Sequence, residues 1–224
     1  MAGRVSISVD VALFTPRGNE LATLLIASDR VNGRRHQGWS LPSDGLRRDE
    51  SLDQAAARIA SAAVGGSPSF LDQAAALGGS LRAGGNSAHV AVAYFGVVPV
   101  TSASAPENVS WIGISELQRI GARCRQEIDV ALTAMRTRLE QRPIAFRLLP
   151  QSFTLSELQT VYELLLGRTV HKASFRRSLH SAALVEATDQ WRSEGRGRPA
   201  RLFRYAPSRR RDRRGGVRFD LIST

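Results

Sequence analysis

The sequence predicts an α+β protein of two domains, and three observations support that prediction. The chain has 224 residues, enough for two domains, and its 42% hydrophobic residues can fill real cores. Apolar residues recur mostly with the period of strands in the first half, and with that of helices where the second half begins. Charge is uneven: residues 1–143 hold 15 Arg against 13 acidic residues, whereas residues 144–224 hold 15 Arg and one Lys against 7. We therefore place the domain boundary near residue 143, where the composition changes.

The first domain opens with a predicted β-hairpin. Apolar residues alternate with smaller or polar ones over 5–13, which is the pattern of a half-buried strand. Turn-forming residues at 16–19 lead into a second strand over 21–27. Residues 28–38 are polar and contain glycine, so we expect a loop there.

Two helices flank a long strand in the rest of this domain. Apolar residues at three- and four-residue spacing predict a helix over 51–63, with Ser51 as its N-cap. The run 89–100 is rich in β-branched and aromatic residues and predicts a strand. A second helix is predicted over 127–140 and ends before Pro143.

The second domain begins with a strong helix signal over 154–166. Thr154 and Glu157 have the spacing of a capping box, and Gly167 follows as a C-cap candidate. The remaining elements are predicted as a helix over 172–183 and two strands over 184–188 and 200–205.

Cellular location is constrained by three negative signals. The sequence has no apolar run long enough to cross a bilayer, and its first residues lack the form of a signal peptide. The single cysteine, Cys124, cannot form an internal disulfide. We expect a cytoplasmic protein that does not engage membranes, in which Cys124 is a small buried residue rather than a nucleophile.

A box of spaced residues follows the first hairpin. Leu41-Pro42 is followed by Glu50, by Arg58 eight residues later and by Gly65. This spacing resembles the Nudix box, in which a strand ending in Leu-Pro precedes a Glu, an Arg-Glu, a Glu-Glu pair and a final Gly. The resemblance implies a Nudix-like domain over residues 1–143.

The same box lacks the residues that hold metal in the Nudix family. Asp44 stands at the position of the first Gly, Ile59 replaces the Glu after Arg58, and Ala62 and Ala63 replace the Glu-Glu pair. Mg²⁺ requires hard oxygen ligands, which Ile and Ala cannot supply. We predict no Nudix hydrolysis, and we expect positions 59, 62 and 63 to extend the buried face of the helix.

The order of motifs in residues 5–206 makes the resemblance more specific. The Nudix-like box is followed by a helix, by Phe153-Thr154-Leu155-Ser156-Glu157-Leu158-Gln159, by Phe175-Arg176-Arg177 and by Ala200-Arg201-Leu202-Phe203-Arg204-Tyr205. This order resembles the Nudix-related transcriptional regulators of NAD metabolism. The resemblance implies an α/β/α sandwich with a mixed sheet, followed over 144–224 by a winged helix-turn-helix domain with a basic tail.

The functional expectations come from the same resemblance. It implies a homodimeric bacterial repressor of NAD biosynthesis or salvage genes, which requires no cofactor. ADP-ribose or a related NAD-derived nucleotide would weaken operator binding, although some relatives sense sugars instead. Because winged-helix operators are usually palindromic, a two-fold dimer on double-stranded DNA is expected.

The helix over 172–183 has the pattern of a DNA-reading helix. Phe175 and Leu179 can pack inward while the basic residues face outward, as the major groove requires. The alternative is a basic face that only contacts water. The DNA-binding candidates in this helix are Lys172, Ser174, Arg176, Arg177 and His180.

The hairpin over 189–201 is a candidate wing. Its Arg196, Arg198 and Arg201 are further DNA-binding candidates, and an Arg-Gly-Arg-Pro segment suits a narrow minor groove. A hairpin that contacts only phosphates is an equally good interpretation. The arginine-rich stretch over 208–216 is expected to add salt-sensitive attraction to DNA.

A phosphate-bearing effector in the first domain would need cations, because the metal ligands are lost. The effector-binding candidates are Trp39, Arg47, Arg48, Glu50, Arg58 and Arg82. Each arginine could instead be a surface charge, Trp39 a core anchor, and Glu50 with Arg58 a structural pair.

Two other functions remain open from the sequence. One is a divergent Nudix nucleotide pyrophosphatase with a basic nucleic-acid-binding appendage, for which Asp44, Asp49 and Glu50 are the only nearby cluster of carboxylates. The other is an RNA-binding module, although the chain lacks the aromatic platform that RNA readers often carry.

Overall fold

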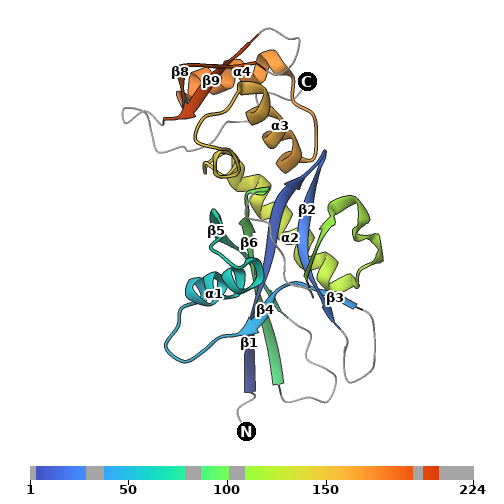
Figure 1. The fold of residues 1–224 in the computed structure, drawn as a ribbon. Coiled ribbons are helices and arrows are strands. Elements are labelled where there is room, and N and C mark those ends of the chain that lie inside the picture. The colour runs from blue at the N-terminus through green and yellow to red at the C-terminus, as the bar shows by residue number, and fades with distance from the viewer. Residues whose placement is uncertain (1–3, 29–37, 79–86, 101–108, 194–198, 207–224) are drawn as a thin grey trace. The chain divides into compact units, whose positions relative to one another are not determined.

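In the computed structural model, described for residues 4–28, 38–78, 87–100, 109–193 and 199–206, the chain divides into two units. The first comprises Met1–Met135 and the second Arg136–Thr224. Figure 1 shows the elements of both units. The division falls within a helix, α2 (Ala122–Leu139), upstream of the change in composition near residue 143.

A seven-stranded mixed sheet forms the centre of the first unit. Its main path runs in the order β3-β2-β1-β6-β5, with β4 paired to β1 and β7 to β2. Strands β1 and β6 are parallel, and the other pairs are antiparallel. The strands are β1 (Arg4–Arg17), β2 (Glu20–Ser28), β3 (Gly38–Ser40), β4 (Ser43–Gly45), β5 (Phe70–Gly78), β6 (Ser87–Val97) and β7 (Val109–Gly113).

Helices cover both faces of this sheet. Helix α1 (Leu52–Val64) packs Ile59 and its buried alanines against the odd-numbered residues of β1, such as Val9 and Val11. The even-numbered residues of β1 point to the other face, where α2 lies behind the sheet (Figure 1). The expected α/β/α sandwich with a mixed sheet is therefore confirmed.

Several predicted elements differ in length from those observed. Strand β1 runs on to Arg17, so the hairpin turns at Gly18, whose positive φ of 59° suits glycine. Helix α2 begins at Ala122 rather than at residue 127. Strand β5 was not predicted, because its alanine-rich sequence has little β-propensity and its pairing with β6 is a tertiary contact.

The second unit has the arrangement of a winged helix. Helix α3 (Leu155–Leu166) is followed by α4 (Lys172–Ala182) and by a ribbon of two antiparallel strands, β8 (Val185–Arg192) and β9 (Ala200–Tyr205). Phe153 forms a bridge to Phe203, which ties the start of the unit to the ribbon. Two short 3₁₀ segments, η2 (Ile114–Arg119) and η3 (Ala145–Leu148), complete the described structure.

A small aromatic core holds the second unit together. Phe175 of α4 lies 5.4 Å from Tyr162 of α3, edge to face, and Tyr162 contacts Phe146 at 6.3 Å. Phe146 in turn packs on Tyr205 of β9 at 4.5 Å. This chain of rings fixes α4 against the rest of the unit. No helix in the described part of the chain is both long and apolar enough to cross a membrane.

Candidate functional site

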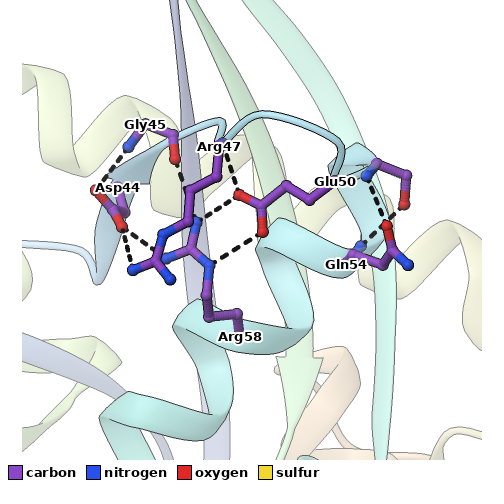
Figure 2. Close-up of polar contacts among 7 residues, drawn as sticks. Asp44, Gly45, Arg47, Glu50, Gln54 and Arg58 are labelled. Carbon is purple, nitrogen blue, oxygen red and sulfur yellow. Dashed lines mark hydrogen bonds and ion pairs between the residues drawn. The ribbon is translucent and has the colours of Figure 1, made fainter.

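Arg58 of α1 is the centre of the box that precedes and enters the helix. Its guanidinium donates to both carboxylate oxygens of Glu50, at 2.7 and 3.1 Å, and to Asp44 at 2.6 Å. A further hydrogen bond reaches the carbonyl of Gly45 at 3.2 Å, and the backbone N–H of Arg47 donates to Glu50 at 2.8 Å. Figure 2 shows that these contacts tie the loop between β4 and α1 to the helix.

The electrostatics of this group follow from the same contacts. Hydrogen bonds from Arg58 hold the pKa of the Glu50 carboxyl and that of Asp44 below their usual values. The two carboxylates, Glu50 first, raise the pKa of the Arg58 guanidinium. Arg58 and Glu50 thus form an ion pair that organises the loop, and most of the guanidinium N–H groups are engaged within it.

The positions that would carry metal ligands do not form a metal site. Ile59 and Ala63 are buried against the sheet, whereas Ala62 is exposed. The expectation that all three extend the buried face of α1 is therefore wrong for Ala62, because its side chain is exposed to solvent. Among the described residues, no group of three or more His, Cys, Asp or Glu side chains is placed to hold a metal ion.

Three of the other effector candidates lie on described residues of the first unit, one on a strand and two in a loop. Trp39 lies half-buried on β3, whereas Arg47 and Arg48 are exposed in the loop before α1. Arg47 lies 3.6 Å from Asp44. Arg82 is outside the described residues.

A polar cluster on the sheet face opposite α1 was not predicted from the sequence. Asp10 of β1, only 4% exposed, accepts hydrogen bonds from Ser43 and, at 3.4 Å, from Ser8. His89 of β6 contacts the hydroxyls of Ser8 and Ser6 at 3.2 and 3.0 Å. The one available sequence signal is a charged residue within the apolar alternation of β1.

Helix α2, which covers this face of the sheet, adds a buried carboxyl group to the cluster. Glu127 is buried, and Arg123 one turn earlier donates to it at 2.9 Å. Burial raises the pKa of Glu127, and the nearby Asp10 raises it further against the opposing effect of Arg123. Burial also raises the pKa of the Cys124 thiol to about 11. Cys124 is buried, as predicted.

In the second unit, local sequence signals fix α3 and α4. The Thr154 hydroxyl accepts from the N–H of Glu157 at 3.1 Å, and the Glu157 carboxylate accepts from the N–H of Thr154 at 2.7 Å, which is the predicted capping box. Gly167 ends α3 in the left-handed conformation, with φ 69°. The following turn leads directly into α4.

Helix α4 has one apolar and one basic face. Phe175 and Leu179 are completely buried, whereas Ser174 is half-buried and contacts His171 at 3.3 Å. The basic side chains of the helix are all exposed: Lys172, Arg176, Arg177 and His180. This is the division of faces that a groove-reading helix needs.

The ribbon after α4 places further cations in the same unit. Arg201 is exposed on β9 and donates to the carbonyl of Thr188 at 2.9 Å, whereas Arg196 and Arg198 lie outside the described residues. Arg192 and Arg204 are instead paired with Glu157 at 2.6 Å and Glu186 at 2.8 Å, respectively.

Together these features define the class of the protein: a Nudix-like domain joined to a winged helix domain with a basic helix face. Residues 145–205 match the family model of the NrtR DNA-binding winged helix domain. The second unit is thus similar to the winged helix domain that this model describes.

Known proteins resemble the chain over nearly its whole length. The ADPR responsive transcriptional repressor NtrR of Acinetobacter baylyi is 28% identical over 208 residues, which cover 89% of this chain and 82% of the relative. The structure of Shewanella oneidensis NrtR complexed with a 27mer DNA has 28% identity and a TM-score of 0.76, with 90% of this chain and 94% of that chain covered. A MutT/nudix family protein from Enterococcus faecalis, 17% identical with a TM-score of 0.66 over 91% of this chain and 87% of its own, shares the fold.

Proposed function

We propose that this chain is a transcriptional repressor that binds double-stranded DNA through its winged helix and responds to ADP-ribose or a related NAD-derived nucleotide. The observation that carries the proposal is α4, whose apolar face is buried and whose four basic side chains are exposed within the NrtR-type domain. The similar Shewanella protein was crystallised with DNA, and the similar Acinetobacter protein is a repressor responsive to ADPR.

The target genes, the cellular location, the assembly and the lack of hydrolysis are proposed from the same resemblance. The regulated genes would serve NAD biosynthesis or salvage, and the protein would act in the bacterial cytoplasm as a homodimer on a palindromic operator. It would need no cofactor and would not hydrolyse its effector. The replacement of three box glutamates by Ile59, Ala62 and Ala63 supports that last statement.

DNA binding is tested by fluorescence anisotropy at fixed, near-physiological salt. The probe is the duplex upstream of the nearest NAD-metabolism gene, with a scrambled duplex as the control. Arg176→Ala and Arg177→Ala should each weaken operator binding by about 1–3 kcal/mol if the side chain reads a base. Arg142→Ala, which removes an exposed arginine outside α4, is the matched control. Equal, weak, salt-sensitive binding to both duplexes contradicts a sequence-specific repressor.

The effector response is tested by titrating ADP-ribose into the protein–DNA complex and, separately, by calorimetry on the free protein. Among the candidates, exposed Arg47 and Arg48 are proposed to bind phosphate, whereas Arg58 and Glu50 are proposed to shape the loop. Arg48→Ala should therefore lower ADP-ribose affinity without changing the melting temperature, whereas Arg58→Ala should lower both. If Arg58→Ala lowers ADP-ribose affinity without lowering the melting temperature, and Arg48→Ala leaves the affinity unchanged, the phosphate contact belongs to Arg58.

The same preparation separates the repressor from a divergent pyrophosphatase. ADP-ribose is incubated with the protein and Mg²⁺ or Mn²⁺, and AMP release is measured. Turnover that disappears in Glu50→Gln would establish an enzyme and overturn the non-catalytic assignment.

A further inference from the structure

One large aromatic side chain of the winged helix unit is left in water. Trp191 on β8 is 58% exposed, although the other aromatic rings of the described part of this unit are buried or half-buried. A tryptophan buries about 150–250 Å² when it is covered, so Trp191 offers a large apolar area to a binding partner.

Strand pairing gives Trp191 a cationic neighbour. Its cross-strand partner on β9 is Arg201, whose guanidinium carbon lies 6.0 Å from the centre of the indole ring. The Nε–H of Arg201 donates to the carbonyl of Thr188 at 2.9 Å, which holds the guanidinium near the ring. The indole and the guanidinium thus form a flat surface that is apolar and positively charged together.

The position of this pair within the ribbon indicates the partner. Trp191 and Arg201 lie one residue pair from the end of the ribbon, next to the connection 193–199 that contains Arg196 and Arg198. Residues 144–224 carry 16 Arg and Lys against 7 acidic residues. A surface that combines a ring with cations in a basic domain is complementary to the nucleic-acid backbone, where deoxyribose offers an apolar face beside each phosphate.

We propose that Trp191 packs on the deoxyribose of duplex DNA beside the α4 contact, while Arg201 binds the adjacent phosphate. This inference rests on the proposed DNA binding and assigns a contact residue that is neither on α4 nor a charged group. Trp191 therefore contributes affinity that does not depend on salt, whereas Arg201 contributes through counterion release.

The test uses the full chain with Trp39→Phe and Trp111→Phe, so that Trp191 is the one tryptophan left in the sequence. Operator binding is followed by anisotropy of labelled DNA, and Trp191 emission is recorded in the same titration. We expect the emission to change in parallel with the anisotropy. The melting temperature and the DNA affinity of this variant are compared with those of the unmodified chain.

Substitutions at the pair then separate the two contacts. Trp191→Ala should weaken operator binding about tenfold, with no change in the slope of log K against log salt. Trp191→Phe should recover part of the loss, and Arg201→Ala should lower the slope by about 0.9. Gln190→Ala, on the exposed neighbour in β8, is the matched control and should bind like the unmodified chain.

Three results would overturn the inference. One is normal DNA binding by Trp191→Ala together with unchanged Trp191 emission, which leaves the proposed function intact. Another is a Trp191 emission that changes with protein concentration in the absence of DNA, which assigns the ring to an interface between copies of the chain. The third is no anisotropy change with any duplex, which refutes the proposed function as well.

Discussion

Introducing a carboxylate at position 59 or at position 62 of α1 should change the stability of the fold to very different extents. Ile59 is 6% exposed and packs into the cluster between α1 and the sheet, whereas Ala62 is exposed on the same helix. Ile59→Glu removes a buried apolar side chain, which costs about 1.5–3 kcal/mol. It also buries a carboxyl group, whose pKa is displaced upward by up to about 3–5 units at such sites.

The pH dependence follows from that displacement. A folded-state pKa above the unfolded value of about 4.3 means that the folded protein binds more protons, so stability falls as pH rises above 4.3. Holding the group neutral at pH 7 costs about 3.7 kcal/mol, which brings the total for Ile59→Glu to about 5–7 kcal/mol. Below pH 4 this ionisation cost disappears, and only the apolar loss and the burial of a neutral carboxyl group remain. Ala62→Glu should change stability by less than about 1 kcal/mol at either pH.

Urea unfolding at pH 4 and pH 7 measures both effects. In a Trp191→Phe background, tryptophan emission reports on Trp39 and Trp111 and therefore on the first unit alone. If Ile59→Glu costs the same small amount at both pH values, the side chain at this position reaches water, and the assignment of position 59 to the buried face of α1 fails.

Three further predictions test the packing and the buried groups. Phe175→Ala should lower the stability of the winged helix unit by about 3–5 kcal/mol, because the ring is fully buried against Tyr162; circular dichroism melting shows this, and an unchanged melt would contradict the packing. The Cys124 thiol is buried and its pKa is raised to about 11. At pH 8 it should react with iodoacetamide at least about 100-fold more slowly than a small-molecule thiol of pKa about 9, and it should become reactive in urea. Rapid reaction of the folded protein would show that the thiol is accessible. The pKa of Glu127 is raised in the folded protein. Its effect on stability is therefore most favourable at low pH, and it declines as the pH rises above the ordinary pKa of a glutamate. Glu127→Gln should flatten that decline in urea titrations, whereas an unaltered profile would assign the dependence to other groups.

The sequence by itself determined the features that depend on neighbouring residues. The capping box at Thr154, the left-handed glycine after α3 and the two faces of α4 are all present as the local pattern predicts. These features were predictable because capping and helix periodicity connect residues at most a few positions apart. The spacing of Glu50, Arg58 and Gly65 is also legible in the sequence, since these residues lie within one loop and one helix.

The tertiary structure decided which distant residues meet. Strand β1 pairs in parallel with β6, and this pairing, together with α2, brings Asp10 near Glu127 in a buried polar cluster. Likewise, only the register of β8 against β9 places Trp191 opposite Arg201. No local pattern specifies such contacts, because the register of a strand is set by the packing of a whole sheet face and not by the strand's own sequence. For the same reason the sequence could name Arg58 as a candidate, but only the structure showed its guanidinium held by two carboxylates.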